Sequence, residues 1–472
     1  MAQPPVPPDD AEKGHLGYAQ GKSSHEMSEA RDEISSVPAT RSTPKDGEPS
    51  NIAARVLSKV ASRTDVVLDP PPDGGWRAWA VVLGGFFVVM DTWGVVNSFG
   101  VFQPYYTVAL NRSPSDVSWI GSFQVFLLFF IGAGTGRLTD AGYFRPLLFS
   151  GTLLVVLAMF TTSFCTSYWQ LFLSQGICMG IGNGLLFTPS MSLASTYFDK
   201  KKSFVIGIVS AGSVPGGLIF PSMVRQLLPT AGFPWTIRAM AFVQLGTLAI
   251  SAVLMKPRLP PRRAGGLVDW SAFRELEYTF YVSAAFMSFW GIYFAFHYVA
   301  AYAEEILGMP YSNALDLLLL LNGMGGVGRV LPNWLADYVG PFNIYIPSAF
   351  LTGLLMYFWI AVSDTAGLYV WTAFYGLAVA GIQGIFLAVV GSMTKDPQKT
   401  GTRMGMATTI VSFACLTGTP IMGAIIRAQE GSYEGAQVFS ATCLMAATAF
   451  GIAGRVVRTR KMGHGAFAWV KV

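Results

Sequence analysis

Long apolar segments, separated by short polar or Gly/Pro-containing loops, fill the chain from Trp79 to Val457. Each segment has about 18 to 28 residues, which brackets the roughly 20 that an α-helix needs to cross a hydrocarbon core of about 30 Å. The pattern predicts an all-α membrane protein with twelve transmembrane helices. The expected spans are 79–106, 116–137, 146–163, 168–191, 204–223, 236–256, 279–303, 314–334, 343–362, 367–393, 405–426 and 437–456.

The composition agrees with a membrane protein. Hydrophobic residues make up 52% of the chain and charged residues 12%, about half the charged share of an ordinary soluble domain. A soluble globular protein is therefore excluded. The four cysteines show no spacing typical of a metal site or a disulfide framework, and we expect neither a metal nor a cofactor. The net charge of +5 does not indicate a nucleic-acid partner, because the positive charges gather in particular loops.

The placement of those positive charges predicts how the chain is oriented in the bilayer. If the N-terminus is cytoplasmic, the outer loops hold little more than Arg112, Arg225 and Arg427. The positive-inside rule therefore places both termini in the cytoplasm. The cations of the inner loops and the C-terminal tail are Arg137, Arg145, Lys200, Lys201, Lys202, Lys256, Arg258, Arg262, Arg263, Arg274, Lys395, Lys399, Arg403, Arg455, Arg458, Arg460 and Lys461.

An N-glycosylation acceptor lies in the expected first outer loop, where Asn111 is followed by Arg112 and Ser113. The topology suits modification of Asn111. Pro114, directly after the triplet, disfavours it, and both outcomes remain open.

The loops also divide the chain into parts. Residues 1–72 are rich in Pro, Ser and charged residues and predict a disordered cytoplasmic tail. A basic, proline-containing linker, 257–278, separates an N-terminal six-helix half, 73–256, from a C-terminal half, 279–457, and 458–472 form a second cytoplasmic tail. The halves echo each other, since Leu-Thr-Asp ending at Asp140 follows span two and Leu-Ala-Asp ending at Asp337 follows span eight. Such repetition is typical of two-halved transporters.

Residues 136–145, which read GRLTDAGYFR, resemble the loop signature of the major facilitator superfamily. The resemblance implies a cytoplasmic latch, in which an aspartate and arginines bind helix ends and one another and so hold one access state. Asp140, Arg137 and Arg145 would have that role here, and Asp337 would repeat it in the second half.

Two further segments, DGGWRAW at 73–79 and YFDKKKS at 197–203, are similar to the paired signatures of the monocarboxylate porter family. NSFGVF at 97–102 and GRVLP at 328–332 resemble its fungal branch. Animal members that transport lactate with protons carry a Lys in span one and an Asp one turn before the Arg of span eight. Asn97 and Gly325 stand at those two positions here, and only Arg329 remains. Proton–lactate symport therefore does not carry over directly.

Four residues inside the spans are candidates for binding substrate or protons. Asp91 lies near the middle of span one, where an uncompensated charge is costly, so it is either a proton acceptor or a buried carboxylate satisfied by its neighbours. The forked guanidinium of Arg329 suits a carboxylate substrate, the alternative being an arginine at the membrane interface. His297 can carry protons but is more often a satisfied interior group. Asn97 is a candidate for lining the central cavity.

Other chemistry is not supported. GMGGVG at 323–328 matches a dinucleotide-binding pattern but lies inside an apolar helix rather than after a strand. No Walker-type nucleotide motif and no nucleophile motif occurs in the sequence. We therefore expect neither an enzyme nor ATP coupling.

The sequence predicts a secondary transporter whose two halves alternate around a central site and carry a small organic acid or related metabolite. A proton gradient is the expected drive, with Asp91 as the proton carrier, and the expected location is the plasma membrane. One alternative is efflux of a larger secondary metabolite. Another is a receptor or sensor that keeps the fold but binds its ligand without transporting it.

Overall fold

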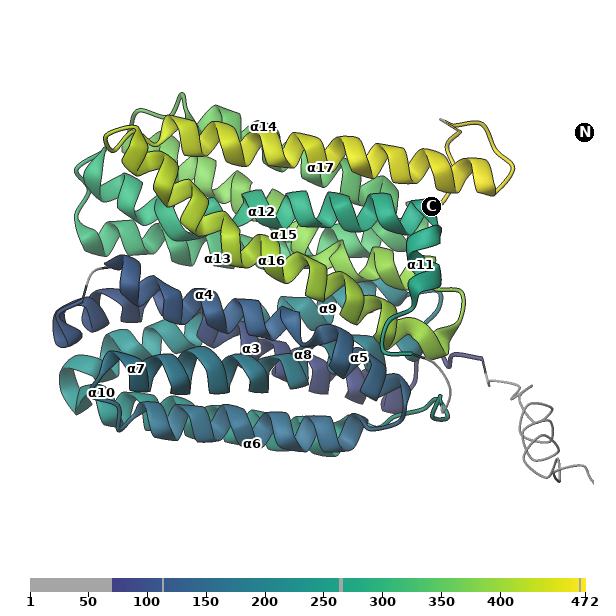
Figure 1. Ribbon diagram of the computed structural model, residues 1–472, viewed down its shortest axis with the longest axis horizontal. Helices are drawn as coiled ribbons and strands as arrows, with labels where there is room; N and C mark the ends of the chain where they lie inside the picture. Colours follow the sequence, from purple (N-terminus) through teal and green to yellow (C-terminus); the bar gives the residue numbers. More distant parts are fainter. Residues whose placement is uncertain (1–69, 113, 263–265, 467) are drawn as a thin grey trace, which may run out of the picture. The chain divides into compact units, whose positions relative to one another are not determined.

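The computed structural model describes residues 70–112, 114–262, 266–466 and 468–472, without the side chains of 104, 114, 115, 311 and 312. The predicted tail, 1–72, lies almost wholly outside these residues, as do Arg263 and Ser113. Leu68–Val472 form one unit by their internal contacts. In Figure 1 the purple-to-teal helices of the first half lie below the green-to-yellow helices of the second.

The first half contains α3 (Trp76–Leu110), α4 (Pro114–Phe130), α5 (Gly132–Asp140), α6 (Phe144–Thr162), α7 (Tyr168–Leu171), the π-helical turn η1 (Phe172–Cys178), α8 (Met179–Thr196), α9 (Lys202–Ala211) and α10 (Ser213–Leu254). After the short linker helix α11 (Trp270–Arg274), the second half contains α12 (Leu276–Glu305), α13 (Tyr311–Val339), α14 (Pro341–Trp359), α15 (Thr365–Met393), the 3₁₀ turn η2 (Pro397–Lys399), α16 (Thr400–Ala428) and α17 (Glu434–Lys461).

The predicted twelve-span fold is confirmed. Among the described residues, eleven helical stretches are long and apolar enough to cross a membrane, and one of them, Lys202–Leu254, contains two passes. The chain reverses inside α10 at Gly232, whose φ of 73° lies in the left-handed region that glycine adopts without strain. Pro229 and Pro234 on either side cannot donate helical hydrogen bonds and help to end one pass and begin the next.

The helix ends differ from the prediction mainly at the linker. Leu276 begins α12 inside the expected linker, and α11 is a helix that the sequence pattern did not indicate. Arg403 explains the ordering of this segment, because its guanidinium donates to Asp269 at 3.2 Å and to Glu275 at 2.6 Å. These two carboxylates flank α11 and fix it to the start of α16.

Large apolar side chains cover the outside of the bundle. On α6, Phe149, Leu153 and Leu157 are exposed and recur every four residues, so they form one stripe along the helix. Exposed apolar stripes of this kind would be costly in water but suit a hydrocarbon environment. They indicate that α6 faces lipid, which agrees with a multi-pass membrane protein.

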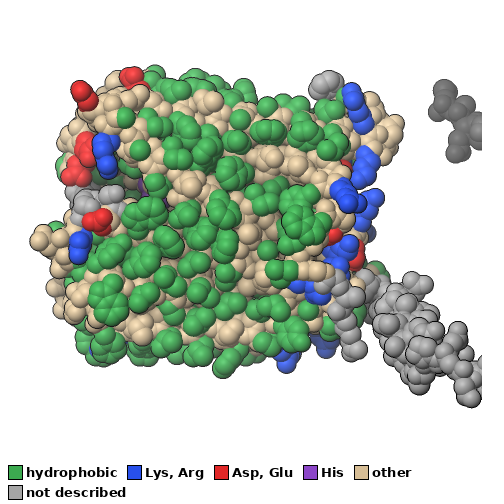
Figure 2. Space-filling view, in the orientation of Figure 1, with side chains coloured by type: hydrophobic (Ala, Val, Ile, Leu, Met, Phe, Trp, Pro, Cys, Tyr) green, Lys and Arg blue, Asp and Glu red, His purple; other side chains and the backbone are tan. Residues whose placement is uncertain are grey.

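The two ends of the bundle carry different charges. Lys and Arg side chains gather at one end, on the right in Figure 2, whereas Asp and Glu predominate at the other. We call the first the basic end; it holds the start of α3, the linker with α11, the turn between α15 and α16, and the end of α17. We call the other the distal end; it holds the turns after α3, α6, α12, α14 and α16.

Candidate functional site

A cavity of about 610 Å³ separates the two halves towards the distal end, and we call it the vestibule. Its walls come from the second part of α3, the middle of α4, the second part of α12 and the first part of α13, with Cys415 from α16. Most of the lining is apolar, and the polar side chains in it are Asn97, Gln103, Thr107, Ser122, Tyr293, His297, Glu304 and Asn322. A cavity of this size can enclose a drug-sized molecule.

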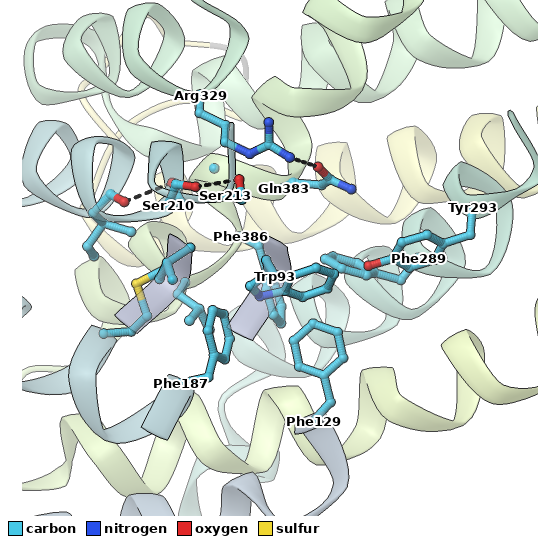
Figure 3. Close-up of a pocket in the computed structure, with 15 residues that line it drawn as sticks. Trp93, Phe129, Phe187, Ser210, Ser213, Phe289, Tyr293, Arg329, Gln383 and Phe386 are labelled. Carbon is cyan, nitrogen blue, oxygen red and sulfur yellow. Dashed lines mark hydrogen bonds between the residues drawn. The ribbon is translucent and has the colours of Figure 1, made fainter. Parts of the chain in front are cut away.

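A smaller cavity of about 40 Å³ lies beyond the vestibule, and Tyr293 lines both. We call it the inner pocket; Figure 3 shows its side chains. Arg329, Gln383, Ser210 and Ser213 form a polar side, and Ser213 donates to the carbonyl of Ser210 at 2.8 Å. The rest of the wall is mainly apolar and comes from both halves, and besides Tyr293 five of its side chains are aromatic, namely Trp93, Phe129, Phe187, Phe289 and Phe386. The inner pocket thus places one cation opposite an apolar wall.

Arg329 is almost fully buried, at 6% exposure. Its Nη2 donates to Oε1 of Gln383 at 2.6 Å, and within the described residues it forms no other hydrogen bond and no ion pair. A charged guanidinium in such a place normally has a carboxylate partner, because an unpaired buried charge is costly. Most of its five donors are therefore available to an anionic ligand.

Gly325 leaves room for the Arg329 guanidinium in its present position. A Cβ on residue 325 would overlap Nη1 of Arg329, which lies one helical turn further along α13. An aspartate here, as the resemblance to proton–lactate symporters would imply, would need the guanidinium to move. With glycine at residue 325, no carboxylate side chain is present at this position to pair with Arg329.

Asn97 bridges the two halves at the edge of the vestibule. Its Nδ2 donates to Oδ1 of Asn322 at 3.2 Å, and Nδ2 of Asn322 donates to the carbonyl of Leu318 at 2.9 Å. The pair joins α3 to α13.

His297 also faces the vestibule and is exposed there. Its ring lies 6.4 Å from that of Tyr293, one turn earlier on α12, and it has no hydrogen bond among the described residues. It is therefore placed to meet a ligand or solvent in the vestibule rather than held as a satisfied interior group.

Asp91 has a different setting from the other candidates. It is fully buried and lines neither the vestibule nor the inner pocket. Its Oδ2 accepts a hydrogen bond from Thr247 at 2.6 Å, its carbonyl accepts one from Gln244 at 3.1 Å, and its Oδ1 has no partner. The side chain thus points from α3 towards the second pass of α10.

Two carboxylates connect the halves at the basic end. Asp140 accepts hydrogen bonds from the backbone nitrogens of Gly401 at 2.9 Å and Thr402 at 2.7 Å, at the start of α16. Asp337 accepts from the backbone nitrogens of Ser203 at 2.8 Å and Phe204 at 2.9 Å, at the start of α9. Each carboxylate thus caps a helix of the opposite half, where the helix dipole favours negative charge.

The arginines of the expected latch behave differently from each other. Arg137 Nη1 donates to the carbonyl of Arg262 in the linker at 3.3 Å, and the backbone nitrogen of Arg262 donates to the carbonyl of Asp140 at 2.8 Å. Arg145 is exposed at the start of α6 and forms no hydrogen bond or ion pair with any described residue. The structure therefore does not bring Arg145 to the other latch residues.

The linker supplies one more contact that sequence reasoning missed. Burial tends to raise the pKa of the Asp269 carboxyl, but hydrogen bonds from Ser271 and Arg403 and the charge of Lys399 more than offset it, so the pKa lies below its ordinary value. The carboxyl is therefore ionised at neutral pH. It is 3.6 Å from Lys399 and 3.2 Å from Arg403, next to the Asp140 contact.

Asn111, the expected glycosylation site, is exposed at the distal end and adopts a left-handed φ of 48° where α3 ends. Ser113 of the same triplet is not among the described residues. Asn111 itself is accessible on the surface of the distal turn.

The aromatic wall of the inner pocket and Tyr293 were also not predicted. Aromatic residues are frequent in every span, and a single sequence does not show which of them face the centre. Gln383 was recognisable as a polar residue deep in a span, but its pairing with Arg329 was not.

Comparison with known proteins gives the family. Residues 81–419 match the Major Facilitator Superfamily. The chain is 49% identical over 416 residues to an MFS-type transporter of Gibberella zeae, covering 87% of this chain and 94% of the relative. It is 36% identical over 400 residues to the aspyridones efflux protein apdF of Emericella nidulans, covering 84% and 81%.

A solved structure confirms the fold. The outward conformation of the transporter FucP aligns with a TM-score of 0.62 at 16% identity, covering 79% of this chain and 98% of that one. The family consists of transporters, not enzymes. The chain therefore belongs to the Major Facilitator Superfamily.

Proposed function

We propose that this protein exports an acidic metabolite with a largely apolar body. The observation that carries the proposal is the buried Arg329 guanidinium, which has no carboxylate partner among the described residues and lies opposite an aromatic wall. An anionic group on the substrate would pair with the guanidinium, and the rings would cover the apolar part.

The relatives support export of a metabolite over uptake of a small acid. One is named an aspyridones efflux protein and covers most of this chain. The vestibule, at about 610 Å³, is also much larger than a three-carbon acid requires. Export of a larger molecule fits both observations.

Transport would proceed by alternating access, in which the halves rock about the central site. The basic end is closed by the Asp140 and Asp337 contacts, whereas the vestibule lies towards the distal end. By the positive-inside rule the basic end, where α3 begins and α17 ends, faces the cytoplasm, and both termini would then be cytoplasmic. The structure then corresponds to the state that releases an exported substrate outside the cell, across the plasma membrane.

The second candidate function is proton-coupled uptake of a small organic acid, which the resemblance to monocarboxylate porters implies. Arg329 supports it as well, since any carboxylate suits the guanidinium. Gly325 and Asn97 argue against proton–lactate symport by the same residues, because the charged groups of the lactate transporters are missing at both positions. A protein that binds without transport is the candidate from another class.

Proton coupling would use Asp91 or His297, and their settings distinguish them. His297 faces the vestibule, so it can exchange protons with solvent in this state. Asp91 lines neither cavity, so it would need another conformation to exchange protons with solvent. We propose His297 as the proton site of the distal state and keep Asp91 as the candidate for the other state.

The test is flux in proteoliposomes, with radiolabelled lactate, benzoate and 4-octylbenzoate, measured as counterflow and under an imposed proton gradient. We expect 4-octylbenzoate to be exchanged in preference to lactate, and Arg329→Gln to lower its flux at least tenfold, with Arg329→Lys less severe. Preference for lactate would favour the second candidate, and saturable binding without counterflow would indicate a receptor.

The same preparation tests coupling. A substitution that removes only the proton site abolishes gradient-driven accumulation and leaves counterflow intact. We expect that result for His297→Gln and compare it with Asp91→Asn. Loss of both activities in either variant would indicate a structural role instead.

A further inference from the structure

A second cavity of about 390 Å³ lies beside the vestibule, between α3, the first pass of α10 and α13. We call it the side chamber. Its wall is mainly apolar, with Val101, Pro221, Val224, Leu228 and Leu319 contributing to it and not to the vestibule. It lies on the seam between the two halves, because α10 belongs to the first half and α13 to the second.

The side chamber and the vestibule have a common boundary. Asn97, Gly100, Leu315, Leu318 and Asn322 line both. The hydrogen bond from Asn97 to Asn322, at 3.2 Å, crosses this boundary. Gly217 leaves the amides room, since a Cβ there would lie 3.2 Å from Nδ2 of Asn97. The boundary thus includes a neutral amide pair between two adjoining, mainly apolar spaces.

A loose ion pair marks the distal edge of the side chamber. Arg225, which lines it, lies 3.9 Å from Asp316 on the facing helix, and both side chains are about half exposed. Exposed pairs at this distance hold helices together only weakly. The seam can therefore widen here without breaking a strong contact.

The opposite seam, between α4 and α16, is filled. Phe413 lies 5.6 Å from Phe126 and 5.7 Å from Phe130, measured between ring centroids, and both pairs are edge-on. Thr409 also donates to the carbonyl of Phe130 at 2.7 Å. Aromatic rings occupy one seam, whereas the other keeps an apolar space that lies directly beside the vestibule.

We infer that the side chamber is a second substrate subsite, which takes the apolar end of the molecule whose acidic group pairs with Arg329. The inference rests on the proposed function and makes it more specific: the substrate is an amphipathic acid with a chain or ring that extends away from the acid. The inner pocket, at about 40 Å³, has no room for that end. The side chamber has room and the matching apolar surface.

The experiment is a chain-length series of 4-alkylbenzoic acids, from methyl to octyl, with the neutral 4-alkylbenzamides in parallel. Binding is measured with the full chain in nanodiscs as the ligand-induced rise in unfolding temperature, after correction for partitioning into empty nanodiscs. The variant is Leu319→Trp, which fills the side chamber. Its matched control is Leu320→Trp, since Leu320 lines neither cavity.

We expect affinity in the wild type and in Leu320→Trp to rise about fourfold for each added methylene once the chain reaches the chamber, as burial of about 0.8 kcal/mol per methylene implies. In Leu319→Trp the short acids should bind as before and the rise should stop. The same chain-length dependence in both variants would overturn the subsite, as would equal loss of short and long acids.

The neutral series separates the two proposals. If benzamides bind as well as benzoates, and Leu319→Trp still removes the chain-length dependence, the subsite stands and an acidic substrate is refuted. If acids are preferred with no effect of Leu319→Trp on long chains, the proposed function stands and the subsite is refuted. Binding of neither series would overturn both.

Discussion

The seam between the two halves is built differently at its two ends. At the basic end the helices meet backbone to backbone: a Cβ on Gly136 of α5 would overlap the carbonyl oxygen of Gly401 on α16. Towards the distal end, the described contacts between the halves at the side chamber are an amide pair at 3.2 Å and an ion pair at 3.9 Å. Close packing and charged caps hold one end, while weak contacts span the other.

If the halves rock as proposed, this difference would let the protein favour one state and still leave it. Hydrogen bonds to a charged carboxylate contribute about 1.5–3 kcal/mol each, and in the proposed rocking the contacts of Asp140 and Asp337 would break when the basic end opens. The other state must offer comparable contacts at the distal end. The basic end therefore sets the balance between states, and changing it should shift that balance.

The largest effect is expected at the glycine contact. Gly136→Val would hold α5 away from α16, because the new side chain meets backbone that cannot yield. We expect counterflow below a tenth of the wild-type rate. Gly134→Val is the matched control on the same helix, since nothing lies within 4 Å of a Cβ at residue 134. It has the same change in helix propensity, so an equal loss in both variants would contradict the contact argument.

A smaller shift is expected from the two carboxylates that cap helices of the opposite half. Asp140→Ala and Asp337→Ala each remove hydrogen bonds to such a helix start. We expect each to lower about tenfold or more the population of the state described here, in which the basic end is closed and the vestibule lies towards the distal end. Spin labels at residues 108 and 306, at the distal ends of α3 and α12, should report a shorter distance.

Asp396→Ala is the control for the caps, because Asp396 accepts from Gln398 within its own half, also at the basic end. If Asp396→Ala shortens the spin-label distance as much as Asp140→Ala and Asp337→Ala do, the loss of any carboxylate at this end would have the same effect, and the capping argument would be wrong. No change in Asp140→Ala or Asp337→Ala would mean that glycine packing alone closes the basic end.

The sequence predicted the span number and the two halves because hydrophobic length is a local property. It also indicated Asp140 and Asp337 as a repeated pair, since the repeat is visible in the chain. It did not predict the inner pocket. Trp93 and Phe386 are far apart in sequence, and the spans that carry them are apolar on all faces, so the pattern does not show which face points to the centre. Nor did it place Asp91, since a charge near mid-span does not reveal which neighbouring helix its side chain meets.

The smallest perturbation tests which side of the membrane each end faces. Which side of the membrane the basic end faces decides whether the structure releases or loads an exported substrate. Asn111, at the distal end, can report that side. In a glycosylating host, Pro114→Ala should improve the acceptor at residues 111–113, and the product should lose mass on treatment with an N-glycosidase. With Asn111→Gln added to Pro114→Ala, the product should not lose mass on this treatment.

Transport by the Pro114→Ala variant should equal that of the wild type, because the sugar would lie outside the vestibule on an exposed turn. A glycan at residue 111 requires this turn to have entered the lumen of the secretory pathway, which places the basic end and its closed contacts in the cytoplasm. If the improved acceptor stays unmodified while an acceptor introduced into the turn before α16 is glycosylated, the orientation is reversed. The state described here would then load an exported substrate rather than release it.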